Sequence, residues 1–268
     1  MREMELRFAG SVPEKYDELM VPLFFHPYAV ELARRAQQAS PRRILETAAG
    51  TGIVTQVLHE AFPEAELIAT DLNSPMLEVA RQRVASGDVR FVVANAQELP
   101  FEDASFDLLV CQFGAMFFPN KVSAHAEAHR VLHDGGIYLL AIWDLIERNP
   151  LSASAQQVLI EMFPDDPPLF MREGPFSYSD PSTIADDLRA SGFGTVELET
   201  IELRSRSPSA RDAAAALCHG TPMGVEVSER APGSLDRIFA AVERSLQRFE
   251  SLNGIDAPMS AHIVTATK

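Results

Sequence analysis

The segment that most constrains the fold of this chain is RRILETAAGTGIVTQVL, residues 42–58. A short apolar run, an acidic residue, a turn of small residues and helix-forming sequence follow one another directly. In open parallel sheets such a strand–turn–helix unit lies where ligands bind, at the carboxyl end of a strand. Gly50 and Gly52 lack a β-carbon, so a ligand can touch the main chain there, and the amides that open the helix favour a partially negative group.

Strands and helices then alternate along the chain at a regular spacing. The strands are expected at 44–47, 67–70, 89–94, 106–111, 137–143, 196–203 and 261–267. The helices between them are expected at 28–38, 52–62, 74–84, 121–132 and 180–190. Ser74 and Pro75 are typical of an N-cap and a first helical position. The alternation predicts an α/β fold with a doubly wound, mostly parallel sheet.

The regular alternation stops after residue 146, and this suggests two parts. Residues 1–146 are predicted to hold the N-terminal helices and a ligand-binding sheet domain. Residues 147–268 are predicted to hold helical cap segments, at about 147–178 and 208–254, together with the last helix and two strands of the sheet. The cap segments are expected to fold over the carboxyl ends of the strands.

Composition excludes several classes of partner. The formal charge of −15 on 268 residues argues against nucleic acid and anionic membranes, because phosphate binding draws on clustered Lys and Arg. No apolar run is long enough to span a bilayer, and the first residues lack the apolar stretch of a secretory signal. Cys111 and Cys218 are too few and too far apart for a disulfide framework. We therefore expect a cytoplasmic monomer or homodimer that acts on a small molecule.

Three residues around the glycine turn limit the ligand. Asp71 closes the neighbouring strand, where a carboxylate can accept both hydroxyls of a ribose, as dinucleotides and adenosyl ligands both require. Thr55 stands where the dinucleotide fingerprint needs a third glycine. Glu46 would repel a pyrophosphate, whereas it suits the ammonium group of an amino acid. A nicotinamide-dependent oxidoreductase stays as the alternative.

Four stretches in order resemble one family. The segment 46–52 resembles motif I of class I S-adenosylmethionine-dependent methyltransferases, and three later stretches resemble the ubiquinone/menaquinone-biosynthesis-like branch. They are ATDLNSPML (69–77), VVANAQELPFEDASFDLLVCQFG (92–114) and HRVLHDGGIYLLAIWD (129–144). The resemblance implies a seven-stranded Rossmann-like sheet, S-adenosyl-L-methionine as cofactor, and methyl transfer to a small acceptor by in-line displacement.

The resemblance also implies which residues hold the cofactor. Ala48, Gly50, Thr51 and Gly52 would line its methionine part, with Glu46 near the amino group. The ribose would bind to Asp71. The adenine would lie among Leu72, Met76, Asn95, Ala96 and Gln97. Gln112 and Phe113 would lie near the sulfonium, and Tyr16 would close over the cofactor.

Two residues depart from the family pattern. Ala48 replaces the first glycine of the motif, and this change is tolerated if φ at that position is negative. Asn95 stands where many members carry Asp, and an amide can both accept and donate, so adenine recognition is expected to survive with altered strength.

The acceptor side of the site is less defined. His219, in the loop CHGTPMG, is the best-placed candidate general base, with a capping or turn role as the alternative. The apolar run 113–118, with Phe163, Phe170 and Phe176, favours an aromatic or otherwise apolar acceptor. His125, His129 and His133 would share one helical face, but no Cys or carboxylate completes a metal site, and no metal is predicted. A non-catalytic protein that binds S-adenosylmethionine is a further alternative.

Overall fold

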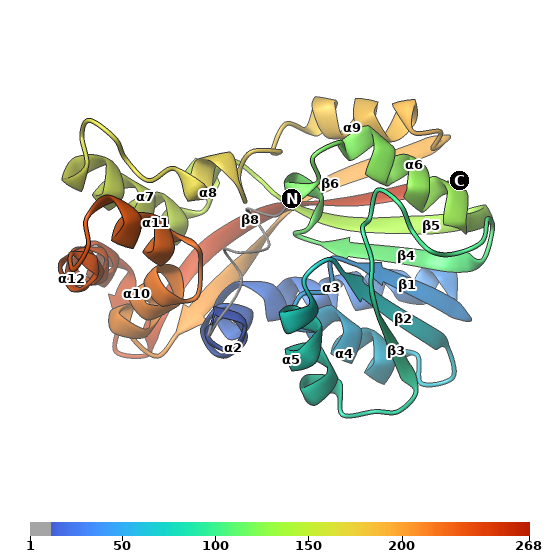
Figure 1. The fold of residues 1–268 in the computed structure, drawn as a ribbon, viewed down its shortest axis with the longest axis horizontal. Coiled ribbons are helices and arrows are strands. Elements are labelled where there is room, and N and C mark those ends of the chain that lie inside the picture. Colours follow the sequence, from blue (N-terminus) through green and yellow to red (C-terminus); the bar gives the residue numbers. More distant parts are fainter. Residues whose placement is uncertain (1–11) are drawn as a thin grey trace. The chain divides into compact units, whose positions relative to one another are not determined.

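The computed structural model describes residues 12–268, which divide into two compact units (Figure 1). The first, here called the sheet unit, comprises residues 28–143, 178–201 and 261–268. The second, here called the helical unit, comprises residues 12–27, 144–177 and 202–260. The N-terminal residues 12–27, expected beside the sheet, therefore cluster with the cap segments.

The sheet unit contains the predicted parallel strands. They are β1 (Arg43–Thr47), β2 (Glu66–Asp71), β3 (Val89–Val93), β4 (Phe106–Gln112) and β5 (Leu132–Trp143). Their spatial order is β3-β2-β1-β4-β5, and all four neighbouring pairs are parallel. The order therefore changes direction beside β1, between β1 and β4, and a ligand crevice is expected at such a switch point.

Two long strands complete the sheet in the order β5-β8-β6. β8 (Gly254–Thr267) runs antiparallel to β5, with Ala141 opposite Ile263, and β6 (Thr195–Ser207) follows it. Both strands continue from the sheet unit into the helical unit, where the two-residue β7 (Glu250–Ser251) pairs with β8. The predicted Rossmann-like, seven-stranded and mostly parallel sheet is confirmed, with β7 as a short addition.

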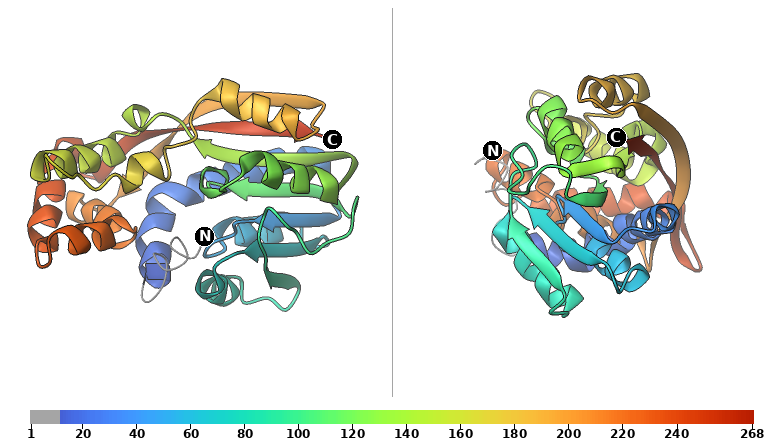
Figure 2. Two further views of the ribbon diagram at one scale, coloured as in Figure 1. Left: turned by 45° about the horizontal axis from the view of Figure 1, so that its top comes forward. Right: turned by 90° about the vertical axis from the view of Figure 1, so that its right-hand side faces the viewer.

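Helices cover both faces of the sheet, as a doubly wound fold requires. Figure 2 shows α6 and α9 on one face, and α3 and α4 on the other. The helices and short helical turns of this unit are α3 (His26–Ala36, which begins in the other unit), η2 (Gln37–Ala39), α4 (Ile53–Ala61), α5 (Ser74–Val84), η3 (Ala115–Phe117), α6 (Lys121–Val131) and α9 (Pro181–Ala190).

Side-chain caps define where α5, α6 and α9 begin, and Asp180 is the cap of α9. The Asn73 side chain accepts a hydrogen bond from the Met76 amide, so the expectation that Ser74 is the N-cap of α5 is wrong by one residue. Asn120 caps α6 in the same way. The caps therefore fix the direction in which the loops before α5 and α6 lead into these helices.

The helical unit packs amphipathic helices on one another. It contains α2 (Val12–Lys15), η1 (Tyr16–Phe25), η4 (Ile146–Arg148), α7 (Pro150–Met162), α8 (Phe170–Glu173), α10 (Ala210–His219), α11 (Met223–Arg230), α12 (Leu235–Leu246) and η5 (Gln247–Phe249). Ile238, Val242 and Leu246 repeat every four residues along α12 and are fully buried, as a core-facing stripe should be. α11 was missed in the sequence, because its eight residues follow a glycine- and proline-containing loop.

No helix within residues 12–268 is both long and apolar enough to cross a membrane.

One histidine of the sheet unit is buried against aromatic rings. His125 on α6 is 0% exposed, and its ring centre lies 5.7 Å from that of Tyr138 and 6.5 Å from that of Tyr178. Neither ring nitrogen has a hydrogen-bond partner in the described part of the chain. Burial lowers the pKa of His125 from 6.5 to about 4; the charge of Asp187 raises this pKa, and that of Lys121 lowers it. The imidazole is therefore held neutral.

We expect His125 to weaken the fold in mild acid. Between pH 6.5 and about 4, His125 is protonated in the unfolded chain but stays neutral in the folded chain. The free energy of unfolding therefore falls as the pH falls towards 4. The loss approaches about 3 kcal/mol. Urea denaturation of wild type and His125→Phe across this pH range measures it, and the variant should lack this part of the slope. Parallel curves for the two proteins would contradict the expectation.

Candidate cofactor site

The turn between β1 and α4 adopts an unusual backbone conformation. Ala48, Gly50 and Gly52 have φ angles of 53°, 55° and 82°, so three residues within five are in the left-handed region. The turn is held against the neighbouring strand, because the Ala49 amide donates a hydrogen bond to the Thr70 carbonyl of β2 at 2.9 Å. The main chain of this segment is therefore pinned at the carboxyl edge of the sheet.

The two glycines serve different purposes. A β-carbon on Gly50 would meet no heavy atom within 4 Å, so the space beside this residue is open. A β-carbon on Gly52 would approach the Ala80 β-carbon on α5 to 2.8 Å. Gly50 thus leaves bare main chain for a ligand, whereas Gly52 lets α4 begin close against α5.

Ala48 is strained in a way the sequence did not indicate. Its φ is positive, so the condition of a negative φ that was set for replacing glycine is not met. Its β-carbon occupies the space that Gly114, just after β4, leaves open, because a β-carbon on Gly114 would collide with it. The methyl group of Ala48 and the missing side chain of Gly114 are therefore complementary.

Asp71 ties the turn to the end of β2. One carboxylate oxygen accepts the Gly50 amide at 2.8 Å, and the other accepts the Asn73 amide at 2.8 Å. Burial raises the pKa of Asp71, while these backbone amides oppose the rise. Two oxygens offer about four acceptor positions, so this carboxylate can still receive hydroxyl groups while it holds the main chain.

Glu46 lies beneath the turn. It is 1% exposed, and its carboxyl accepts a 2.5 Å hydrogen bond from the hydroxyl of Thr55, in the first turns of α4. Burial raises the pKa of Glu46 to about 8, the Thr55 hydroxyl lowers it, and the nearby Asp71 raises it further. Thr55, which departs from the dinucleotide fingerprint, therefore has a specific partner here.

Thr51 lies inside the turn with 2% of its surface exposed. Its carbonyl accepts a hydrogen bond from the Arg83 guanidinium of α5 at 3.1 Å, and Arg83 also reaches the Gln56 side chain at 3.2 Å. Arg83 was not expected in the site from sequence, and it acts here as a brace for the main chain of the turn.

The expected adenine region lies at the ends of β2 and β3. Leu72 is 38% exposed and Val93, opposite Asp71 in the sheet, is 52% exposed, whereas Met76 is buried. Val93 was missed in the sequence, and its signal is an apolar residue at the last position of a strand. Ala96 is partly exposed in the loop that follows. Exposed apolar side chains at strand ends suit the face of a planar base.

Two polar residues of this region already have partners in the chain. The Asn95 side-chain oxygen accepts the Gln97 amide at 3.0 Å. The Gln97 side-chain oxygen accepts the Asn120 amide at 2.7 Å, just before α6. Gln97 therefore orders the loop before α6, and the side-chain amide of Asn95 has a fixed orientation.

An aromatic cluster follows β4. The Phe113 ring stacks on Trp143 with ring centres 3.8 Å apart and planes 3° apart, and Tyr28 meets both rings edge-on. Phe113 has a φ of 52°, so the stack holds a second strained residue at the carboxyl edge. Gln112, directly before it, is only partly buried. The buried Phe113 side chain is committed to packing.

The two predicted residues outside the sheet unit belong to the helical unit. The Tyr16 ring stacks on Phe25 with centres 5.1 Å apart, within η1. His219 ends α10, and its ring lies 5.5 Å from that of Phe239 on α12. Burial lowers the pKa of His219, with Lys15 acting in the same direction. Roles at the cofactor for these two residues stay predictions.

The proposed helical face of three histidines does not form. α6 ends at Val131, so His133 lies in β5 and contacts Asp107 at 2.6 Å, while His129 packs edge-on against Phe193. Residues 12–268 contain no group of three or more His, Cys, Asp or Glu side chains that could hold a metal ion.

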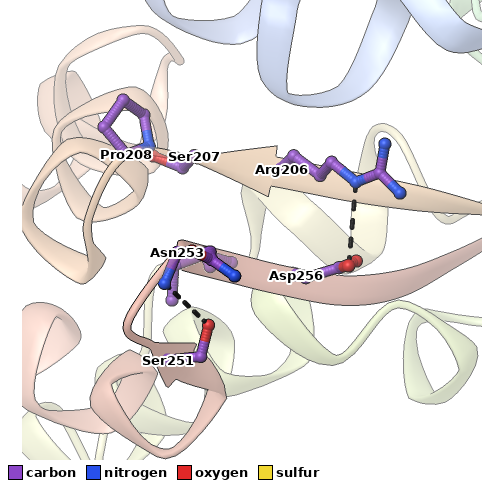
Figure 3. A pocket seen from close by; sticks show the side chains of 7 residues that line it. Arg206, Ser207, Pro208, Ser251, Asn253 and Asp256 are labelled. Atoms are coloured by element: carbon purple, nitrogen blue, oxygen red, sulfur yellow. Dashed lines mark hydrogen bonds and ion pairs between the residues drawn. The ribbon is translucent and has the colours of Figure 1, made fainter.

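A cavity of about 360 Å³ lies in the helical unit, where β6 ends and β8 begins (Figure 3). Arg206, Asn253 and Asp256 are among its lining residues, and Arg206 forms a 3.7 Å ion pair with Asp256. None of the residues predicted to bind the cofactor lines this cavity.

Comparison with known proteins identifies the family of this chain. The methyltransferase domain family matches residues 45–140. A demethylmenaquinone methyltransferase of Deinococcus radiodurans is 31% identical over 174 residues, which are 61% of this chain and 72% of that protein. A demethylmenaquinone methyltransferase of Thermus thermophilus is 42% identical over 110 residues, but these cover only 40% of this chain and 49% of that protein.

Solved structures share the fold at low sequence identity. The YcgJ protein from Bacillus subtilis has a TM-score of 0.59 at 19% identity and covers 90% of this chain and 98% of its own. A phosphoethanolamine N-methyltransferase 2 of Haemonchus contortus, in complex with S-adenosyl-L-methionine, has a TM-score of 0.60 at 16% identity and covers 96% and 56%. The [4+2]-cyclase SpnF has a TM-score of 0.53 at 19% identity and covers 91% and 81%.

The strand order of the sheet, the glycine turn after β1 and the similarity to known methyltransferases together define the class of protein. The chain belongs to the class I S-adenosylmethionine-dependent methyltransferases, in the branch that contains the demethylmenaquinone methyltransferases. Its cofactor is S-adenosyl-L-methionine, and its reaction is methyl transfer. The nicotinamide-dependent alternative is set aside by this result.

The complementarity of Ala48 and Gly114 predicts a strong energetic coupling. Gly114→Ala should destabilise the fold by about 1–3 kcal/mol, because the new methyl group overpacks against Ala48 and lies 3.0 Å from the Cys111 sulfur. Ala48→Gly should recover a large part of that loss, since it removes both the collision and a left-handed alanine. Urea denaturation of the two single variants and the double variant measures the coupling. Additive losses would show that the two positions are independent.

Proposed function

We propose that this methyltransferase acts on a carbon of a small aromatic ring of the hydroquinone type. The single observation that carries this proposal is the relationship to demethylmenaquinone methyltransferase, which extends over 72% of the Deinococcus protein. The apolar run 113–118 supports it, because this segment directly follows the carboxyl end of β4.

The residues of the turn fit the bound cofactor. Gly50 leaves open space beside its main chain, Asp71 has acceptor positions for ribose hydroxyls, and Leu72 and Val93 are exposed at adjacent strand ends. The bound cofactor supplies a methyl group on a sulfonium, which is already a strong electrophile. The protein's contribution is therefore to orient the acceptor in line with the methyl group and to exclude water.

The acceptor ring must gain one methyl carbon and lose one proton from the attacked position. His219 stays the candidate to receive the ring hydroxyl's proton during methyl transfer; the hydroxyl regains a proton when the methylated carbon loses its own to the solvent. Burial lowers the pKa of His219, so the imidazole is neutral near pH 7. Tyr16 stays a candidate for closing over the cofactor. We propose that the helical unit supplies acceptor specificity, as the cap segments were expected to do.

Calorimetry with S-adenosylmethionine tests the cofactor site. Asp71→Ala should weaken binding by about 1–3 kcal/mol, because hydroxyl groups lose a charged acceptor. The variant also releases the Gly50 and Asn73 amides. Asp107→Ala is a matched control, because Asp107 likewise accepts two backbone amides, those of Arg42 and Arg43, but lies at the amino end of β4. Unchanged affinity in Asp71→Ala, or an equal loss in Asp107→Ala, would contradict the assignment.

Turnover with chosen acceptors tests the substrate class. The wild-type chain should form S-adenosylhomocysteine and a product 14 mass units heavier with a reduced 1,4-naphthoquinone, by mass spectrometry, because replacing H with CH3 adds about that mass. With histamine or phosphoethanolamine, the wild-type chain should form no more methylated product than the Asp71→Ala variant forms with the same amine. Faster methylation of either amine than of the naphthohydroquinone would overturn the proposed acceptor.

A further inference from the structure

The cavity at the end of β6 has no part in the proposed methyl transfer. It lies wholly within the helical unit and has a volume of about 360 Å³ (Figure 3). Its lining consists of residues 206–208, at the end of β6, and residues 251, 253, 255 and 256 of the β7–β8 hairpin. A cavity of this volume can take a small organic molecule.

One closely packed glycine holds the walls of the cavity together. Gly254, in the turn of the hairpin, is buried and has a φ of 88°. A β-carbon on this residue would collide with the carbonyl oxygens of Ser207 and Pro208. Within the turn, the Ser251 hydroxyl donates a hydrogen bond to the Gly254 carbonyl at 3.0 Å. The hairpin therefore packs directly against the end of β6, and the cavity is formed before any ligand binds.

Two side chains that line the cavity have hydrogen-bond donors to spare. The Arg206 side chain is 73% exposed, and its one polar contact within residues 12–268 is the ion pair with Asp256. The nitrogen and oxygen of this pair are 3.7 Å apart, which is longer than a hydrogen bond. The side-chain amide of Asn253 has no hydrogen-bond partner in the same part of the chain. Both groups carry several N–H donors, so the cavity can bind a ligand that supplies acceptor oxygens.

The carboxylate that lines the cavity is held by a second arginine. Arg204 donates to the Asp256 carboxylate at 2.6 Å and to the Asp256 main-chain carbonyl at 2.8 Å. The Arg204 guanidinium lowers the pKa of Asp256, so this carboxyl is ionised at neutral pH. Two guanidinium groups and one carboxylate leave a local charge of +1, in a chain whose formal charge is −15. Glu250, also on the hairpin, accepts the Ala210 amide of α10 and does not line the cavity.

We propose that this cavity binds a small organic monocarboxylate. The planar guanidinium of Arg206 matches the two oxygens of a carboxylate and donates parallel hydrogen bonds to them. The side-chain amide of Asn253 supplies a further donor, and the carbon part of the ligand lies against Pro208 and Ile255. A single negative charge balances the local excess of one positive charge, whereas a phosphate dianion exceeds it. The inference concerns a second binding site and does not depend on the proposed acceptor.

Nuclear magnetic resonance of the full chain labelled with ¹⁵N tests the site, with benzoate as the probe. Benzoate should shift the Arg206 Nε–H and the Asn253 side-chain amide resonances until they saturate. The Kd should be about 1–10 mM, because an exposed ion pair contributes modestly to affinity. Benzyl alcohol, which has the same ring without the charge, should leave both resonances in place. Inorganic phosphate should bind more weakly than benzoate.

Matched variants separate binding in the cavity from a general effect of charge. Arg206→Gln should weaken benzoate binding at least about tenfold, because the carboxylate loses its charged partner. Arg211→Gln is the control, since Arg211 is similarly exposed, at 69%, and forms a 3.5 Å ion pair with Glu243, but does not line the cavity. This control should bind benzoate as the wild-type chain does. Arg206→Lys should recover only part of the affinity, because an ammonium keeps the charge without the planar geometry.

Several outcomes would overturn the monocarboxylate site. Unchanged Arg206 and Asn253 resonances in the presence of benzoate would show that the cavity does not bind it. Equal shifts with benzyl alcohol would show that the carboxylate is not recognised, and tighter binding of phosphate would assign the wrong anion. An equal loss of affinity in Arg206→Gln and Arg211→Gln would show a general effect of charge. Both arginines are exposed, so both variants should keep the wild-type melting temperature, and their affinities can be compared directly.

Discussion

The site depends on one carboxylate at the end of β2. Asp71 holds the Gly50 amide with one oxygen and the Asn73 amide with the other, so a single side chain fixes the turn after β1 and the start of α5 together. Both partners are main-chain groups; Gly50 has a left-handed φ of 55°, whereas Asn73 is extended with a φ of −95°. The turn at the switch point of the sheet is therefore already organised before a ligand arrives, which reduces the ordering cost of binding.

The carboxyl edge of the sheet holds both strained residues and acidic side chains. Ala48 and Phe113 both have positive φ angles, and each is held by tight packing, against Gly114 and Trp143 respectively. Two carboxyl groups, of Glu46 and Asp71, frame the turn, and burial raises the pKa of both. Strained residues persist only where their surroundings determine them, and here those surroundings are the elements that would face a cofactor.

Much of this arrangement could be predicted from the chain itself. The parallel strands, the helices between them and the acidic residues at two strand ends all follow from local patterns, namely apolar runs of strand length, helical spacing and glycine turns. The family motifs assigned the cofactor for the same reason, since they lie in short contiguous stretches. The misses were also local, such as Asn73 in place of Ser74 as the N-cap, because neighbouring polar residues compete for the same cap.

What the sequence determined by itself is therefore the order of elements and the chemical type of the turn. Tertiary structure alone decided that Gly52 faces Ala80, that Ala48 fills the space beside Gly114, and that Thr55 binds Glu46. It also grouped residues 12–27 with the helical segments. The physical reason is that torsion angles, burial and hydrogen-bond partners depend on residues far apart in the chain, and no local pattern records which of them meet.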